Sequence, residues 1–149
     1  MNFPRTTVGG ISLPRMLIGC NWISGFSHRS AAGDTMIRKA HRDPASTAAI
    51  FQTFMNSGVD AVLGLFGVDA NLSKAVKMAE DATGKQMIIV DTLVLNMDDT
   101  AMARHEAELE IKASAARGAT FCLPLHSSVE QLINKNTETM DRLPDYLRM

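Results

Sequence analysis

The chain has 149 residues, 46 % of them hydrophobic and 21 % charged, so it is long enough for one folded domain (1–149) and too apolar for a disordered chain. Its net charge of −1 at pH 7 gives no electrostatic reason to bind nucleic acid or an anionic membrane. No stretch predicts a signal peptide or a membrane span, and we expect a cytoplasmic protein whose Cys20 and Cys122 are buried free thiols.

Four apolar runs, each followed by a helical pattern, predict four parallel β/α units. The runs cover residues 15–22, 59–67, 85–92 and 119–128. They are apolar almost throughout rather than alternating, which is typical of parallel strands covered on both faces. Between the first run and the next helix, GDTMIRKAHRD (33–43) predicts one or two helical turns capped by Asp34.

The helices are predicted from capping residues and glycine stops. Their bounds are Asp43 and Pro44 to Gly58, Asp69 or Asn71 to Gly84, and Asp98–Thr100 to Gly118, followed by a last helix over 129–149 with a break before Pro144.

This order predicts an α/β fold with right-handed helical crossovers between parallel strands. An open flavodoxin-like sheet would need five strands and a reversal of strand order, whereas a TIM-type (β/α)8 barrel would need eight units. Polar residues at the strand ends, Asn21, Asp91 and His126, favour the barrel. We therefore predict a (β/α)4 half-barrel, either truncated or pairing with a second copy through its open edges.

Parallel barrels carry their active sites at the carboxyl ends of the strands. Strand alternation places Ile89 and Asp91 on one face. We expect that face, because it carries the polar Asp91, to point into the barrel. Asp91 and His126 are then the predicted catalytic pair, either for proton transfer or as two ligands of a divalent metal.

The connection from Trp22 to Pro44 is far longer than the usual two to six residues, which predicts a lid over the strand ends. Its candidate substrate-binding residues are Asn21, Trp22, Ser27, His28 and Arg29. The last three would bind a carboxylate or phosphate; alternatively, His28 and Arg29 only cover the barrel end.

The segment TTVGGISLPRMLIGCNW (6–22) resembles the start of aldo-keto reductases, where a hairpin with a glycine turn leads into the first barrel strand. LPLHSS (123–128) is similar to that family's fourth strand, which implies that His126 is the active-site histidine. Phe66–Gly67 stands where the family has Tyr–Gly, Val62–Gly64 where it has an aspartate, and Asp91–Thr92 where it has a lysine.

These departures bear on the chemistry that the resemblance implies. Aldo-keto reductases protonate a carbonyl with a tyrosine whose pKa the lysine lowers, and Phe66 has no proton to give. The resemblance thus implies a barrel in which reductase chemistry has been lost or replaced.

Three functions follow as hypotheses. The first is an enzyme or enzyme fragment (a lyase, isomerase, hydrolase or oxidoreductase) acting on a small polar metabolite through acid/base or metal-assisted chemistry. The second is a degenerate aldo-keto-reductase-like barrel that binds a nicotinamide or another ligand, and the third is a non-catalytic assembly module. A divalent metal or NADP is left open as cofactor, and a homo-oligomer or a missing C-terminal half-barrel as partner.

Overall fold

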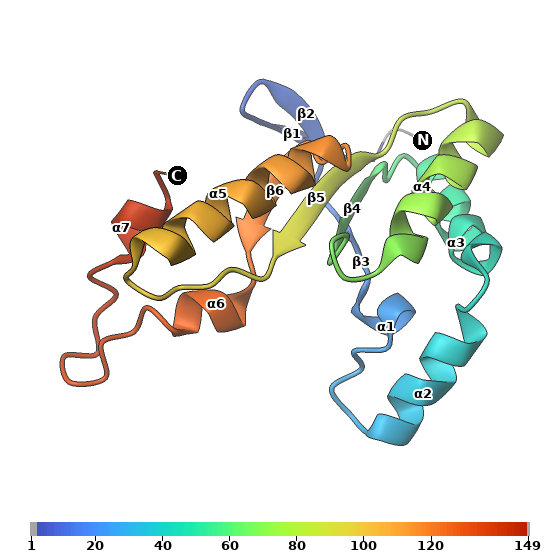
Figure 1. The fold of residues 1–149 in the computed structure, drawn as a ribbon. Helices are drawn as coiled ribbons and strands as arrows, with labels where there is room; N and C mark the ends of the chain where they lie inside the picture. Colours follow the sequence, from blue (N-terminus) through green and yellow to red (C-terminus); the bar gives the residue numbers. More distant parts are fainter. Residues whose placement is uncertain (1–2, 149) are drawn as a thin grey trace.

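The computed structural model describes residues 3–148. It opens with an antiparallel hairpin formed by β1 (Arg5–Val8) and β2 (Ile11–Pro14) (Figure 1). The turn is made by Gly9 and Gly10, whose φ angles of +56° and +81° lie in the region that favours glycine. The hairpin with a glycine turn that the resemblance implied is therefore present.

A four-stranded parallel sheet follows, built from β3 (Ile18–Gly19), β4 (Ala61–Gly64), β5 (Ile88–Leu93) and β6 (Phe121–Pro124). The strands lie side by side in chain order, β3-β4-β5-β6. This confirms the predicted α/β fold with a parallel sheet. The described sheet has four strands and no reversal of order, so it lacks the switch point of a flavodoxin-like sheet.

Helices α3 (Pro44–Asn56), α4 (Ala70–Thr83) and α5 (Ala101–Ala116) make the crossovers. The predicted caps are confirmed, because the side chains of Asp43, Asp69 and Thr100 each accept a hydrogen bond from a backbone N–H in the first turn. Glycine follows each helix in the left-handed conformation at Gly58, Gly84 and Gly118.

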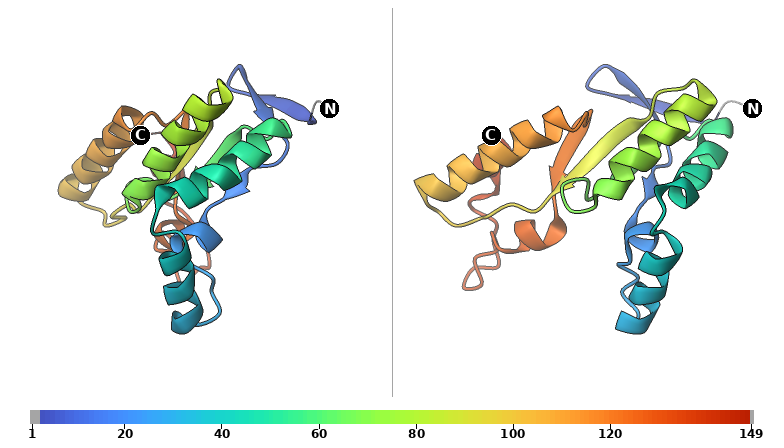
Figure 2. Two further views of the ribbon diagram at one scale, coloured as in Figure 1. Left: turned by 90° about the vertical axis from the view of Figure 1, so that its right-hand side faces the viewer. Right: turned by 45° about the vertical axis from the view of Figure 1, so that its right-hand side comes forward.

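One face of the sheet is buried beneath these helices (Figures 1 and 2). Right-handed crossovers between strands in unreversed order place every connecting helix on the same side. Ile18, Val62 and Ile89, which are neighbours in the strand register, point into this layer. The main core is completed by side chains of α3 and α4, among them Phe51, Met55, Leu72 and Val76.

The opposite face carries the register partners Gly19, Leu63, Val90 and Phe121. Its side chains are apolar, yet α3, α4 and α5 leave it uncovered, and Leu123 near its carboxyl end is 40 % exposed. Parallel sheets are ordinarily covered on both faces. This face is called the open face below.

The C-terminal segment does not form the single helix predicted over 129–149, so that prediction was wrong. It forms α6 (His126–Glu130), a bridge between Asn134 and Thr139, and α7 (Leu143–Tyr146). The Asn134 side chain accepts a hydrogen bond from a backbone N–H two residues on, a local alternative to helix. Pro144 lies in the first turn of α7, where no N–H donor is needed, rather than at a break.

The connection from Trp22 to Pro44, called the lid below, also differs in detail from the prediction. The apolar run before it (15–22) ends as a strand at Gly19, because the short helix α1 (Asn21–Ser24) begins shortly after β3. Helix α2 (Ala31–Ala40) is longer than expected and is capped by Ser30, whose side chain accepts a hydrogen bond from the Gly33 N–H. Asp34 lies in the first turn and is not the cap.

The two cysteines are both free, as expected, but only Cys20 is buried. Cys122 is exposed because β6 is an edge strand, so the prediction of a buried thiol was wrong there.

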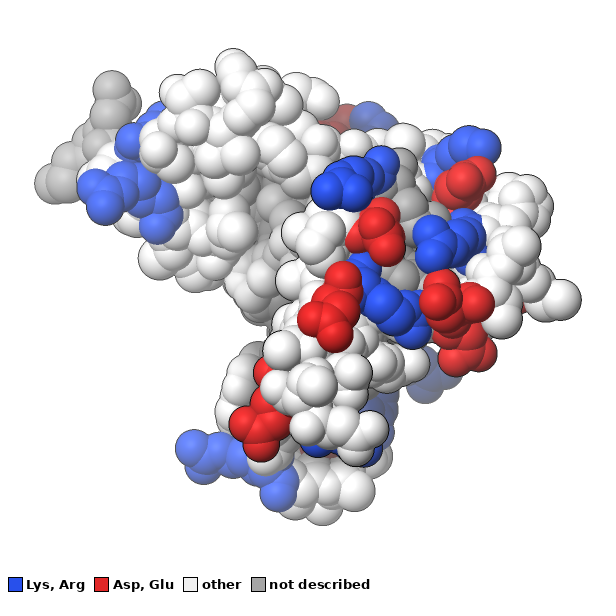
Figure 3. All heavy atoms as spheres, turned by 90° about the vertical axis from the view of Figure 1, so that its left-hand side faces the viewer, with Lys and Arg blue, Asp and Glu red and all other residues white. Residues whose placement is uncertain are grey.

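None of the helices within residues 3–148 combines the length and apolar character needed to cross a bilayer. On the face drawn in Figure 3, basic and acidic side chains lie next to one another.

Candidate small-molecule site

A pocket of about 570 Å³ lies at the carboxyl ends of the parallel strands, where the open face meets the lid. This volume is in the range of ligand-binding cavities. Its apolar lining comes from β4, β6 and the segments that follow them, and its aromatic lining from the lid. The lining residues are Gly19, Cys20, Asn21, Trp22, Phe26, His28, Leu63, Gly64, Leu65, Thr92, Leu123, Pro124, Leu125 and His126.

Four polar side chains reach this pocket: Asn21, His28, Thr92 and His126. The Asn21 amide Nδ2 lies 3.3 Å from His28 Nε2. At this distance the amide and the imidazole are hydrogen-bond partners, and the contact orients the His28 ring beside Asn21. His126 is the first residue of α6 and is exposed.

His28 has a φ of +57°, which places a side chain in the left-handed backbone region. That conformation costs a non-glycine residue about 1–2 kcal/mol. Strained residues of this kind cluster at binding and catalytic sites, where surrounding contacts hold them.

The contacts that hold the lid come from α2. The Ser27 backbone N–H donates to Asp34 Oδ1 at 2.8 Å, and the Ser27 hydroxyl donates to the same oxygen. Arg38 Nη1 donates to the Gly25 carbonyl oxygen at 3.0 Å. The loop that carries His28 is thus fastened to α2 at Gly25 and Ser27, just before the histidine.

Only some of the five predicted substrate-binding residues reach the pocket. Asn21, Trp22 and His28 line the pocket, whereas Ser27 and Arg29 do not. Ser27 is buried with its hydroxyl directed to Asp34, and Arg29 is exposed outside the lining. The lid therefore presents an imidazole and aromatic rings to the pocket, not the expected anion-binding trio.

Asp91 does not lie where it was expected, at the mouth with His126. It shares its face with Ile89, as predicted, but that face packs against the helices, while its neighbour Thr92 reaches the pocket. The side chain is 0 % exposed. The structure thus does not bring the predicted catalytic pair together.

Three residues donate hydrogen bonds to the Asp91 carboxylate. The Phe66 N–H donates to Oδ1 at 3.0 Å, the Ser114 hydroxyl to Oδ2 at 2.8 Å, and Arg117 Nη2 to Oδ2 at 2.9 Å. Arg117 also pairs with Glu110 at 2.7 Å. These bonds satisfy a charge that would otherwise be costly to bury, and they join β5, the segment after β4, and α5.

Sequence reasoning missed Phe26, Thr92 and the leucines of the open face. One signal was available in the sequence: Ser114 and Arg117, at the end of the helix after Asp91, are polar groups toward which Asp91 could turn. Turning Asp91 to the helix places its neighbour Thr92 on the opposite face. Phe66, which the resemblance sets against a tyrosine, is buried in the core.

Cys20 lines the pocket but is poorly suited to act as a nucleophile. Burial, with a further contribution from the carboxylate of Asp69, raises the pKa of its thiol to about 12. The thiolate is the reactive form, so this side chain serves as an apolar wall at neutral pH.

Within the described residues, no three histidine, cysteine or acidic side chains are grouped so that they could hold a metal ion. His126 and Asp91 in particular do not share the pocket.

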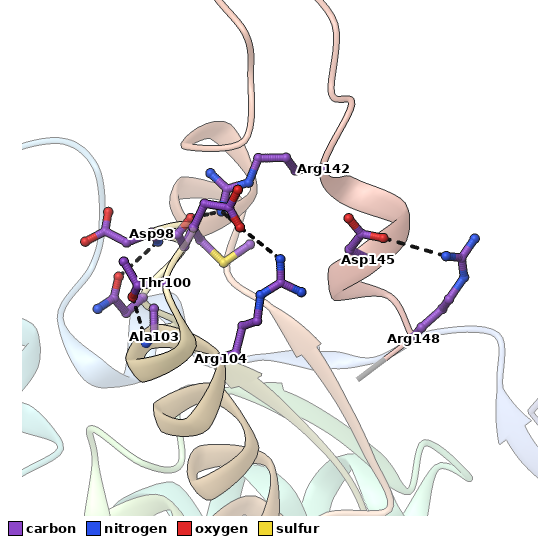
Figure 4. A network of polar contacts seen from close by, with 10 residues as sticks. Asp98, Thr100, Ala103, Arg104, Arg142, Asp145 and Arg148 are labelled. Atoms are coloured by element: carbon purple, nitrogen blue, oxygen red, sulfur yellow. Dashed lines mark hydrogen bonds and ion pairs between the residues drawn. The ribbon is translucent and has the colours of Figure 1, made fainter.

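A second polar cluster joins the C-terminal segment to the loop before α5 (Figure 4). Arg142 Nη2 donates to the Met97 carbonyl oxygen, and Arg104 pairs with Asp99 at 2.9 Å. Arg148 pairs with Asp145 at 3.6 Å. Because these groups bind one another and the backbone, the cluster is explained by attachment of the C-terminal segment.

Comparisons with protein-family models, curated proteins and solved structures return no match for this chain. The comparisons therefore give no support to the resemblance to aldo-keto reductases.

Replacing Asp91 with asparagine should lower the free energy of unfolding by about 2–3 kcal/mol, because an amide nitrogen replaces an acceptor of Ser114 and Arg117. Urea unfolding followed by circular dichroism measures this change. In the matched control, Asp81→Asn removes the exposed partner of Lys77 and should leave the midpoint unchanged. Equal stability of Asp91→Asn and the wild type would contradict the bridging role.

Acid should loosen the lid. Hydrogen bonds from the Ser27 hydroxyl, then from its N–H, lower the pKa of Asp34. A lowered folded-state pKa means that the stabilisation is fully present above the unfolded value, about 3.9, and is lost as the pH falls through the folded value. Trp22 fluorescence should therefore change below about pH 4 in the wild type.

The variant Asp34→Asn should remove this acid transition, while Asp81→Asn, an exposed carboxylate outside the lid, should keep it. An identical acid transition in Asp34→Asn and the wild type would show that the Ser27–Asp34 contact does not hold the lid.

Proposed function

We propose that this protein is a half-barrel enzyme or enzyme fragment that binds a small organic molecule in the strand-end pocket. His28 and His126 are its proton-transfer groups and Asn21 orients the His28 ring. The observation that carries the proposal is that two exposed imidazoles line one cavity at the carboxyl ends of parallel strands. Imidazole is the side chain most often used for general acid–base catalysis.

The lining supports a ligand with an apolar or aromatic body and one polar group. Leucines from β4 and β6 form the walls, and the rings of Trp22 and Phe26 lie on the lid side. Thr92 and Asn21 add hydroxyl and amide groups that can orient a carbonyl or hydroxyl oxygen. A small carbonyl or hydroxy compound fits this combination better than a highly charged metabolite.

The unreversed strand order supports the half-barrel part of the proposal. Helices on a single face of a parallel sheet are the arrangement of a (β/α)8 barrel, in which the other face becomes the interior. In such barrels the carboxyl ends of the strands hold the active site, which is where this pocket lies.

Binding of a nicotinamide without reduction is the second candidate. The exposed ring of Trp22, 58 % accessible beside the pocket, offers a stacking surface for a planar heterocycle. The reductase step itself is not proposed, because Phe66 is buried and carries no acidic proton.

A thermal-shift screen with small aldehydes, ketones and hydroxy acids, and with NADPH, tests both candidates. Trp22 is the only tryptophan, so its fluorescence reports on any compound that enters the pocket. We expect His28→Asn, which tolerates the left-handed backbone, and His126→Gln each to weaken binding about three- to tenfold through loss of a polar contact.

The matched control is His105→Gln, which alters an exposed histidine on α5 away from the pocket and should bind like the wild type. If no compound in the panel shifts the melting temperature, or if the hits bind both pocket variants unchanged, the proposed function is lost. A response to NADPH alone would favour the second candidate.

A further inference from the structure

We propose that a second copy of this chain completes the sheet. Strand β6 of each copy pairs with β3 of the other, which gives a closed eight-stranded parallel barrel around a twofold axis. This inference goes beyond the small-molecule site proposed above, and the second copy would supply the missing wall of that pocket.

The first support is that both edges of the sheet are free. In the described chain β3 and β6 each have one strand neighbour. The Thr120 N–H, just before β6, donates to the Ile89 carbonyl oxygen, so by alternation along the strand the N–H groups of Phe121 and Leu123 point away from β5. Neither edge strand contains a charged residue of the kind that protects natural edges from pairing.

The second support is the apolar character of the open face. Leu63, Leu65 and Leu123 line the pocket on this face, and Leu123 keeps 40 % of its surface accessible. Side chains in these register positions fill the interior when a parallel sheet closes into a barrel. A second copy would bring a matching set of the same side chains across the barrel axis.

The third support is the size of the surface. The chain of 16.2 kDa exposes 9156 Å². A compact monomer of that mass is expected to expose about 7,500 Å². The excess, about 1,700 Å², is roughly twice the area that one partner buries in a standard protein interface. The surplus is therefore large enough for an extensive contact between two copies.

The strand arrangement favours two copies over any other number. Each chain supplies four parallel strands, and eight strands enclose an interior that side chains just fill. A twofold axis along the barrel keeps all strands parallel and uses both free edges of both chains, so association stops at the dimer. A single β6–β3 contact without closure would leave edges that recruit further copies.

Light scattering coupled to size-exclusion chromatography, over a wide range of concentrations, tests the pairing. We expect a mass twice the 16.2 kDa of the chain. Leu123→Lys places a charge on the open face and should give the monomer. Leu109→Lys is the matched control, because Leu109 is an equally apolar side chain, 50 % exposed on α5 away from the open face, and should remain a dimer.

Hydrogen exchange of the wild type keeps the test decisive if Leu123→Lys fails to fold. The outward amides of Phe121 and Leu123 should be protected at high concentration and exchange faster on dilution. A monomer at every concentration, an assembly larger than two, a dimeric Leu123→Lys variant, or concentration-independent exchange in β6 would each overturn the inference.

Trp22 fluorescence with the hits of the panel, or with NADPH, separates this inference from the proposed function. A monomer that binds one of these compounds keeps the site and overturns the pairing. A dimer whose fluorescence responds to none of them supports the pairing and removes the proposed ligand site.

Discussion

Right-handed connections between neighbouring parallel strands decide which face of this sheet is covered. Because the order β3-β4-β5-β6 never reverses, α3, α4 and α5 all pack on one side, where Ile18 and Ile89 are buried. The other side keeps Leu63 and Leu123, which are equally apolar but lack a covering layer. The uncovered apolar face, with the pocket at its strand ends, follows from that single constraint.

The Asp91 carboxylate secures the helical side of this arrangement. It accepts hydrogen bonds from the chain after β4 and from the end of α5, so one buried charge joins three consecutive segments. Residues with the chemistry of a catalytic acid can therefore serve the scaffold, and the direction of the side chain, not its type, separates the two roles. At the strand end it is Thr92 that faces the pocket.

The lid shows how a strained residue can be held in place. Ser27, Asp34 and Arg38 fasten the loop to α2, and the left-handed backbone at His28 then directs the imidazole to the pocket beside Asn21. Of the polar residues in this loop, Ser27 is hydrogen-bonded to Asp34 and Arg29 lies outside the pocket lining, whereas Asn21 and His28 reach the pocket. The proposed site therefore has histidine rather than anion-binding character.

Local physics made the limits of the three crossover helices and the parallel strands predictable: Asp43, Asp69 and Thr100 cap helices through their own side chains, and Gly84 ends one through its backbone. The position of the pocket was predictable too, since Asn21 and His126 follow strands. The sequence by itself could not decide that Asp91 turns toward α5, that Cys122 is exposed, or that the Ser27 hydroxyl donates its hydrogen bond to Asp34. Those outcomes depend on the packing partners of each side chain, and residues distant in sequence supply those partners only when the tertiary structure forms.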